Sequence, residues 1–343
     1  MSRRGATLLV AAAGVLIAIA VAVVAPVPYV ALTPGPTLNT LGTLSGKPLI
    51  QIKGHLVYPT KGNLNMVTVS FLGGPGTKFN IFAALHAWLS PHDAVVPESE
   101  IFTPGQSSQQ VAKEDTEEMA NSQQTATAAA LCQLGIAFKT VDTIQATVKG
   151  MPAAGVLRPG DVIVAVGGTR VTCRADAGTL IKARKPGTPV ELTILRQGRT
   201  QQVRLVTADV QGAPEIGVEI VESFVFPFSV TFSVGDIGGP SAGLMFALGI
   251  IDKITPDNLA GGRFIAGTGE IEADGTVDPI GGIQQKMAGA RAAGATIFLT
   301  PAANCADTAG AVPAGMRLIK VSSLAGAIAD LNALKAGRPV PAC

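Results

Sequence analysis

The beginning of the chain constrains its fold most strongly, because residues 6–30 form an apolar run that contains no charged residue. A run of roughly 20 apolar residues is long enough to cross the hydrocarbon core of a bilayer as a helix. Arg3 and Arg4 precede the run, and basic residues beside a span favour the cytoplasmic side. We therefore expect residues 1–34 to comprise a cytoplasmic start and a transmembrane signal anchor, with an extracytoplasmic remainder.

A cleaved signal peptide is the alternative interpretation of this segment. Ala18, Ile19 and Ala20 have the small-x-small form of a cleavage site. The apolar run continues beyond them to Val30, which favours an uncleaved anchor. Both interpretations predict export from the cytoplasm.

Export bears on the four cysteines, which permit two disulfide bonds in three connectivities. Cys343 ends a proline-containing tail with little apolar surface, so a bond to Cys305 would hold this tail in place. Cys132 and Cys173 then remain to form the second bond. We expect no metal site, because the chain has no Cys-x-x-Cys pair and its histidines lie far off in sequence, namely His55, His86 and His92.

Ser241 is a candidate nucleophile because of its place before an apolar helical pattern. Pro240 precedes it, and proline is favoured in the first turn of a helix. Ser241 would then lie at a helix N-terminus, where unpaired N–H groups and the helix dipole stabilise an oxyanion. We expect the backbone N–H groups of Ser241 and Ala242 to form that oxyanion hole. Taken alone, a serine at this position is also a common helix cap.

Lys286 is a candidate general base because it falls on the apolar face of a predicted helix, residues 283–293. Ile283, Met287 and Ala290 recur at helical spacing around it, and Gly294 closes the helix. Burial lowers the pKa of a lysine, so a neutral amine near pH 7 could accept the proton of a serine hydroxyl. Taken alone, such a lysine also extends its ammonium to solvent in many proteins.

Together with their flanks, these two segments resemble the proteolytic domain of Lon-type serine proteases. The resemblance covers residues 239–243, 267–271, 279–286 and 292–295, in the family's order and at about its spacing. It implies Ser241 as nucleophile, Lys286 as general base, Thr268 as an orienting hydroxyl, and a homo-oligomer, since such domains commonly form rings. The family often has an acidic residue three positions before the serine, whereas this chain has Gly238, and its nearest acid is Asp236.

Residues 150–168 resemble the core signature of bacterial PDZ domains. This resemblance implies a groove helix at residues 176–185 and closing strands at 189–196 and 200–206. No Gly-Φ-Gly-Φ segment precedes Thr143, so the carboxylate-binding loop has no assigned position. Peptide-terminus binding is therefore less firmly expected than the fold.

The region before the PDZ-like segment loosely resembles the start of the Lon proteolytic fold. A hairpin at residues 54–71, turning at 60–63, and a helix within 114–131 correspond to its opening elements. We therefore expect an α+β protein: a Lon-type proteolytic domain that carries a PDZ-like β-barrel or sandwich insertion and follows one transmembrane helix. The expected parts are the anchor at 1–34, protease at 35–135, PDZ at 136–208, protease at 209–335 and a tail at 336–343.

The sequence thus predicts a membrane-anchored extracytoplasmic serine endopeptidase that acts on polypeptides recruited or gated by its PDZ domain, without a cofactor. A net charge of +2 gives no signal for nucleic acid. We expect no nucleotide, because the Gly-Lys pair at 46–47 lacks the P-loop glycine, replaced by Leu41, and the hydroxyl residue, replaced by Pro48.

Two alternative functions are considered, of which the sequence disfavours the first and leaves the second open. In a trypsin-like protease, the motif at residues 235–240 would require serine where this chain has Ile237. A membrane-tethered peptide-binding adaptor with an inactive protease fold differs only in lacking catalysis.

Overall fold

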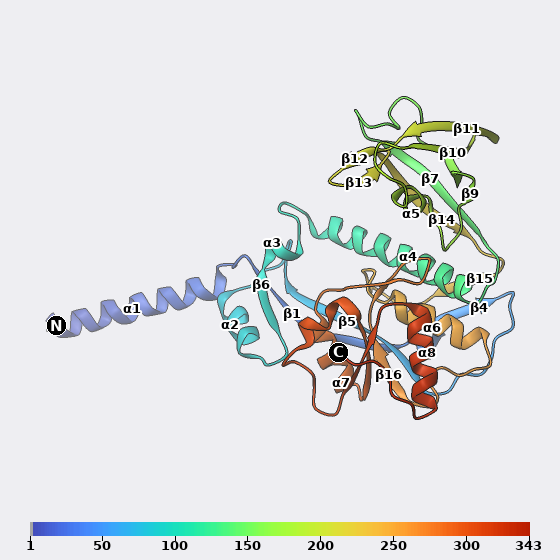
Figure 1. Ribbon diagram of the computed structural model, residues 1–343. Coiled ribbons are helices and arrows are strands. Elements are labelled where there is room, and N and C mark those ends of the chain that lie inside the picture. The colour runs from blue at the N-terminus through green and yellow to red at the C-terminus, as the bar shows by residue number, and fades with distance from the viewer. Residues whose placement is uncertain (1–2) are drawn as a thin grey trace.

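The computed structural model describes residues 3–343 and divides into an N-terminal helix, a body and a smaller lobe above the body (Figure 1). Helix α1 (Arg3–Val24) points away from the body, and none of its most apolar stretch is buried. By length and composition it could cross a membrane, although a signal sequence meets the same criterion. Residues 1 and 2 of the expected cytoplasmic start lie outside the described part.

The body is built on a mixed sheet whose strands come from both sides of the PDZ-like segment. The strand order is β20-β19-β16-β5-β1-β6, and β5 pairs antiparallel with β1 but parallel with β16. Strands that precede the lobe in sequence therefore share one sheet with strands that follow it. The bounds are β1 (Tyr29–Asn39), β5 (Asn63–Gly73), β6 (Ala94–Pro97), β16 (Phe264–Gly267), β19 (Ile297–Pro301) and β20 (Arg317–Val321).

Helices cover the two faces of this sheet, as the alternation of its side chains requires. Leu64 and Met66 of β5 face a core that includes α4 (Ser108–Gln133), α6 (Gly243–Ile254) and α8 (Leu324–Lys335). Val67 points to the opposite face, where α7 (Ile283–Ala292) packs. Helix α7 agrees with the predicted helix 283–293, and α4 starts earlier than predicted because Ser107 and Gln110 form a capping box.

Short elements complete the body around this sheet. Two-stranded ladders join β2 to β3, β4 to β15, and β17 to β18. Their bounds, and those of the remaining helices, are β2 (Thr43–Leu44), β3 (Lys47–Pro48), β4 (Ile50–Lys53), β15 (Ser229–Phe232), β17 (Glu270–Ile271), β18 (Val277–Asp278), α2 (Ile81–Leu89), α3 (Glu98–Ile101), and the 3₁₀ helices η1 (Ala302–Asn304) and η2 (Ala306–Thr308).

The predicted hairpin at residues 54–71 is wrong. Only its second half forms a strand, β5, and Tyr58 instead donates its N–H to the Lys253 carbonyl at 2.7 Å. Both edges of β5 are occupied, by β1 and by β16, so the preceding segment has no edge with which to pair.

The smaller lobe contains a second sheet with the strand order β11-β10-β8-β7-β14, and β9 pairs with β8. Strands β10 (Pro189–Arg196) and β11 (Arg199–Val206) and helix α5 (Ala177–Lys182) lie where the sequence predicts them. The other elements are β7 (Lys139–Thr147), β8 (Val162–Val166), β9 (Thr169–Arg170), β12 (Ala208–Val210), β13 (Ala213–Glu215) and β14 (Val218–Val225).

The lobe extends further along the chain than the expected end at residue 208. Strand β14 pairs antiparallel with β7 from Val218 to Val225, and Ile216, Val218 and Ile220 pack into the lobe's apolar core. Residues 209–225 therefore belong to the lobe and not to the body, and β14 is part of the lobe's sheet. The expected boundary was too early because the last strand follows the β12–β13 hairpin.

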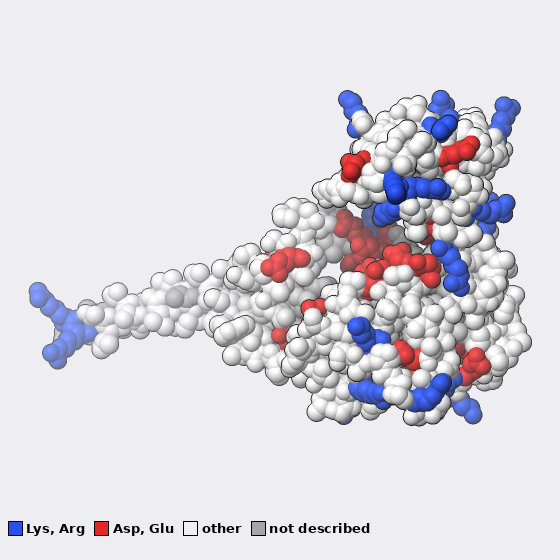
Figure 2. All heavy atoms as spheres, viewed as in Figure 1, with Lys and Arg blue, Asp and Glu red and all other residues white. Residues whose placement is uncertain are grey.

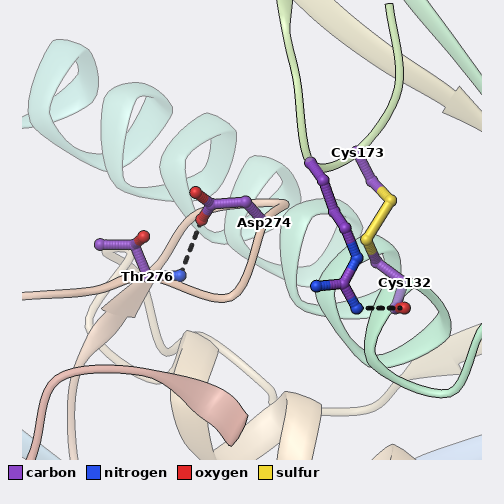
Figure 3. The surroundings of a disulfide bond; sticks show 5 residues. Cys132, Cys173, Asp274 and Thr276 are labelled. Carbon is purple, nitrogen blue, oxygen red and sulfur yellow. Dashed lines mark hydrogen bonds between the residues drawn. A yellow bond between two sulfur atoms is a disulfide. The ribbon is translucent and has the colours of Figure 1, made fainter. Parts of the chain in front are cut away.

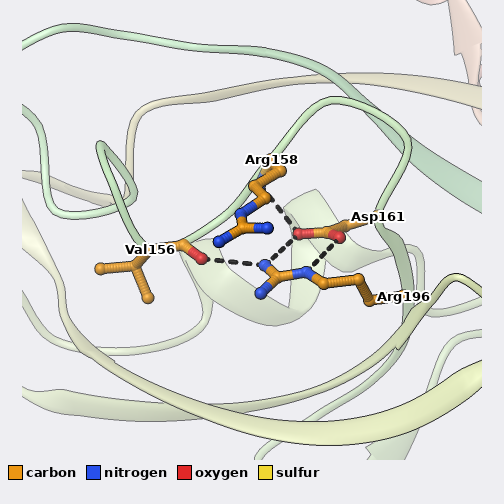
Figure 4. A network of polar contacts seen from close by, with 4 residues as sticks. All are labelled: Val156, Arg158, Asp161 and Arg196. Atoms are coloured by element: carbon orange, nitrogen blue, oxygen red, sulfur yellow. Dashed lines mark hydrogen bonds and ion pairs between the residues drawn. The ribbon is translucent and has the colours of Figure 1, made fainter.

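An ion pair between the partly exposed Arg196 and the buried Asp161 fixes one turn of the lobe (Figure 4). Arg196 donates to the Asp161 carboxylate through Nε at 2.7 Å and Nη2 at 2.6 Å, and to the Val156 carbonyl at 2.9 Å. The Asp161 carboxylate also accepts the Arg158 N–H, and these donors hold its pKa below the usual range. The turn within the PDZ-like signature is thereby attached to β10.

Two disulfide bonds are present, and they are the pairs that the sequence favours. Cys132–Cys173 connects the end of α4 to the lobe, where Arg174 also donates to the Cys132 carbonyl at 3.3 Å (Figure 3). Cys305–Cys343 attaches the C-terminal residue to the body. The first bond covalently links the lobe to a helix of the body.

Candidate active site

Ser241 and Lys286 line the same groove, which has a volume of about 470 Å³. The groove is lined by residues 66–71 of β5 and by residues 236–242 before α6. Its lining also includes Asp115 and Met119 of α4, Glu270, and the segment that leads into α7. The groove is therefore assembled from segments on both sides of the lobe in sequence.

Ser241 lies in a turn immediately before α6, at the helix N-terminus where the sequence places it. Helix α6 begins at Gly243, with Ala242 as its N-cap. The Pro240 carbonyl accepts the Ser122 hydroxyl at 2.8 Å, and the Ser241 carbonyl accepts the Gly269 N–H at 2.9 Å. These contacts fix the turn that carries Ser241 against α4 and the segment after β16.

The backbone N–H groups of Ser241 and Ala242 have no acceptor among residues 3–343. They lie at the entry to a helix, where backbone dipoles favour negative charge. Gly239, two residues earlier, has φ +83°, a conformation that favours glycine.

The environment of Lys286 is apolar, and only 4% of the residue is exposed. Burial lowers the pKa of Lys286 from its usual 10.5 to about 8, while the nearby Glu270 carboxylate raises it and limits the shift. A measurable fraction of the amine is therefore neutral near pH 7, as a general base requires.

Thr268 connects the lysine to the serine segment. Its hydroxyl accepts a hydrogen bond from Lys286 Nζ at 3.3 Å and donates to the Ser241 carbonyl at 2.9 Å. Within residues 3–343, Lys286 Nζ donates to Thr268 and the Ser241 hydroxyl has no hydrogen-bond partner. The structure thus brings the three predicted site residues together, with Thr268 oriented by both neighbours.

Asp115 and Glu270 are groove residues that sequence reasoning missed. The Gly239 N–H donates to the Asp115 carbonyl at 3.1 Å, and a Cβ on Gly238 would lie 2.4 Å from the Asp115 Cβ. Asp115 therefore occupies the space that an acidic residue at position 238 would need. Burial raises the pKa of both Asp115 and Glu270. Glu270 lies within residues 267–271, one of the segments that resemble Lon-type proteases. Nothing in the sequence indicated that Asp115 belongs to the site, because it lies on α4, far from Ser241 along the chain.

The three histidines do not contribute to this groove. His55, His86 and His92 are exposed, and none lines it. His55 instead packs against the ring of Phe228 at 4.6 Å between centroids. The trypsin-like alternative therefore has no histidine beside Ser241.

A second hollow, of about 260 Å³, lies in the lobe between α5 and the segment that leads into β14. Gly178, Ile181 and Lys182 of α5 form one side, and residues 214–218 with Ile220 form the other. Gly217 has φ +73° and turns the chain into β14. The strand beside the groove helix is thus β14, which comes at the end of the lobe, well beyond Thr143.

Comparison with known families defines the class of both parts. The family described as PDZ domain matches residues 132–207, and the Lon protease (S16) C-terminal proteolytic domain matches residues 234–330. The chain therefore carries a PDZ domain and a Lon-type proteolytic domain, which is a serine protease domain. Both family resemblances seen in the sequence are confirmed.

Individual relatives match a short stretch of the chain. Lon protease 2 of Herpetosiphon aurantiacus and Lon protease 1 of Sorangium cellulosum are each 45% identical over 69 residues, which is 20% of this chain and 8% of those proteins. The chain thus spans a small part of the length of these relatives. The PDZ domain of an SdrC-like protein from Listeria innocua is 24% identical, over 23% of this chain and 92% of that one, with a TM-score of 0.22.

Proposed function

We propose that this chain is a serine endopeptidase that uses a Ser241–Lys286 dyad, with Thr268 as a positioning residue. The observation that carries the proposal is that Lys286, a buried lysine with a lowered pKa, lines the same groove as Ser241. Lys286 donates a hydrogen bond to the Thr268 hydroxyl, which in turn donates to the Ser241 carbonyl. Each of these three residues, taken alone, could serve only to stabilise the fold. Their convergence in one groove favours catalysis.

The proposed reaction is acyl transfer. Ser241 Oγ attacks the carbonyl carbon of a peptide bond as Lys286 Nζ takes the hydroxyl proton, and the N–H groups of Ser241 and Ala242 stabilise the oxyanion. Lys286 then gives its proton to the leaving amine as the C–N bond breaks. In the second half of the reaction, Lys286 Nζ takes a proton from water as the water oxygen attacks the acyl-enzyme carbonyl. Lys286 then returns the proton to Ser241 Oγ as the ester C–O bond breaks, which releases the acid product and restores the serine.

We propose that hydrolysis is independent of ATP. Residues 43–48 form the short β2–β3 ladder, in which Ser45 and Gly46 have positive φ, in place of a phosphate-binding loop before a helix. Without a nucleotide-driven step, substrates must arrive as extended polypeptides.

The test is hydrolysis of a reduced and alkylated, permanently unfolded protein by the purified full chain. Peptide products should accumulate at the same rate with and without ATP. No hydrolysis under either condition, from a chain that folds correctly, would support the alternative of a peptide-binding adaptor.

We propose that α1 anchors the protein in a membrane, with both domains outside the cytoplasm. Helix α2 supports this proposal, because Asn80 at its start donates to the Val23 carbonyl of α1 at 3.0 Å. Helix α2 exposes a set of large apolar side chains beside the end of α1: Ile81, Phe82, Leu85, Trp88 and Leu89. Such a surface suits the boundary between headgroups and acyl chains.

Trp88 is the only tryptophan of the chain, and 71% of it is exposed, so it reports directly on this contact. In nanodiscs we expect lipids with brominated acyl chains to quench its fluorescence strongly, because the indole would lie at the membrane boundary. Aqueous acrylamide should quench it less in nanodiscs than in the unfolded chain. Full acrylamide quenching without bromine quenching would contradict this orientation.

We further propose that the PDZ domain is an insertion within the proteolytic domain that recruits or gates polypeptides. The pairing of β5 with β16 across the lobe supports this division. With the lobe ending near residue 225, the proposed parts are the anchor at 1–34, protease at 35–135, PDZ at 136–225, protease at 226–335 and tail at 336–343.

A further inference from the structure

The hollow of about 260 Å³ between α5 and β14, here called the lobe groove, continues into another hollow where the lobe meets the proteolytic domain. This junction hollow has a volume of about 380 Å³ and shares Gly178, Lys182 and Ile220 with the lobe groove. The two hollows therefore form one path along α5 and β14. Strand β14 is the last strand of its sheet, so one of its edges lies open for an added strand.

Five carboxylates line the junction hollow, from both domains. Three belong to the lobe, and two lie in the turn between β17 and β18 of the proteolytic domain: Asp142, Asp176, Glu222, Glu272 and Asp274. Among the described residues that line it, Lys182 is the one basic side chain. Acidic side chains gather in the hollow between the lobe and the body (Figure 2).

Asp142 is an independent sign that this hollow binds a cation. It is only 1% exposed, and while one carboxylate oxygen accepts the Ala177 N–H at 2.8 Å, the other has no partner. Glu222 Oε1 is likewise buried without a partner. Burial and the surrounding carboxylates raise the pKa of Glu222 to about 7. A bound cation would relieve both conditions.

The geometry favours a long side-chain cation over a metal ion. No group of three or more His, Cys, Asp or Glu side chains in residues 3–343 lies close enough together to hold a metal. The hollow is also held in place, because Cys132–Cys173 ties the lobe to α4 next to Asp274 (Figure 3).

The register of β14 sets where a basic side chain would have to be. Val218, Ile220 and Glu222 alternate with more exposed neighbours and share one face. An antiparallel peptide whose last residue lies beside Val218 would place its third residue from the end beside Ile220 and its fifth beside Glu222. Glu222 lies about 13 Å along the strand from Val218, at about 3.3 Å per residue.

We propose that the PDZ lobe and the turn at residues 272–274 together bind C-terminal polypeptide segments that have a lysine or arginine as the fifth residue from the end. The proposal deepens the recruiting role proposed above by naming the class of polypeptide that the lobe selects. The lobe groove takes the apolar C-terminal residue, and the junction carboxylates take the basic side chain.

The test is fluorescence anisotropy of dye-labelled octapeptides with a C-terminal valine, titrated with the full chain carrying Ser241→Ala to prevent cleavage. A peptide with lysine as the fifth residue from the end should bind about 10-fold more tightly than its glutamine counterpart, as a hydrogen-bonded charge pair would provide. Moving the lysine to the fourth residue from the end should remove this preference, because that side chain points to the opposite face of the bound peptide strand.

Two variants locate the preference in the protein. Glu222→Gln in the lobe and Glu272→Gln in the proteolytic domain should each weaken the lysine peptide and leave the glutamine peptide unchanged. Glu219→Gln is the matched control, since Glu219 lies on β14 but faces away from both hollows. Equal affinities for all peptides, no binding of any peptide, or a preference that survives both variants would overturn the proposal.

Failure of this proposal can be told apart from failure of the proposed protease. In a chain that retains Ser241, Glu222→Gln should leave hydrolysis of a short reporter peptide unchanged. If the chain with Glu222 and Glu272 intact showed no lysine preference while reporter hydrolysis by the wild type was normal, only the recruiting site would be rejected.

Discussion

Replacing Ser241 with alanine should reduce peptide hydrolysis to background. The substitution removes the only atom that the proposed mechanism uses to form the acyl-enzyme, and loss of such a nucleophile costs about 10⁶ in kcat in a serine protease. The fold should survive, because the Ser241 contacts to Thr268 and Gly269 are made by its carbonyl, which alanine retains. A fluorogenic peptide assay, with circular dichroism on the same samples, measures both properties.

The matched control is Ser229→Ala, which alters an exposed serine of β15 outside the groove. It should retain the wild-type rate. Wild-type hydrolysis by Ser241→Ala would show that another residue is the nucleophile.

Replacing Lys286 with methionine should lower kcat by about 10²- to 10⁴-fold, the range that a general base contributes. Methionine fills a similar space in the apolar site but cannot take a proton. Wild-type activity in this variant would reject the dyad.

The same substitution should stabilise the protein at neutral pH. The unfolded chain holds the Lys286 proton up to about pH 10.5 and the folded chain up to about pH 8, so the unfolded state binds more protons between these values. Stability from this group therefore rises with pH between about 8 and 10.5, and the full penalty of about 3 kcal/mol applies below pH 8. Lys286→Met removes this penalty, and thermal unfolding at pH 7 should show a higher Tm than wild type.

The pH profile offers a further check on Lys286. Hydrolysis by the wild type should rise as the pH passes through about 8, where the amine loses its proton. The Glu270 carboxylate raises this pKa, so Glu270→Gln should move the rise to lower pH. A shift to higher pH, or no shift, would mean that another group controls the profile.

The sequence predicted local elements well where one periodic pattern decides the structure. Helix α7 lies where its apolar pattern places it, and strands β10 and β11 lie where the PDZ resemblance places them. The sequence failed to predict which strands pair when the pairing depends on distant segments. Strand β5 pairs with β1 and β16 instead of with the segment before it. Strand β14 was assigned to the proteolytic domain and not to the lobe for the same reason, since an alternating strand is compatible with either sheet.

The candidate site was predictable as a set of residues but not as a geometry. The motifs around Ser241 and Lys286 named the two residues, and the apolar stripe around Lys286 predicted its burial. The turn before α6 depends on contacts from Ser122 and Gly269, which no local pattern reveals. Asp115 enters the groove only because α4 packs across it.

Covalent labelling of the full chain with a fluorophosphonate tests the dyad most directly, because this reagent reacts with serines activated by a neighbouring base. Mass spectrometry should locate the label on Ser241 in the wild type, with a rate that increases as the pH passes through about 8. Labelling should be lost in Lys286→Met. Modification of a different serine, or equal labelling of Ser241 in wild type and Lys286→Met, would contradict the proposed dyad.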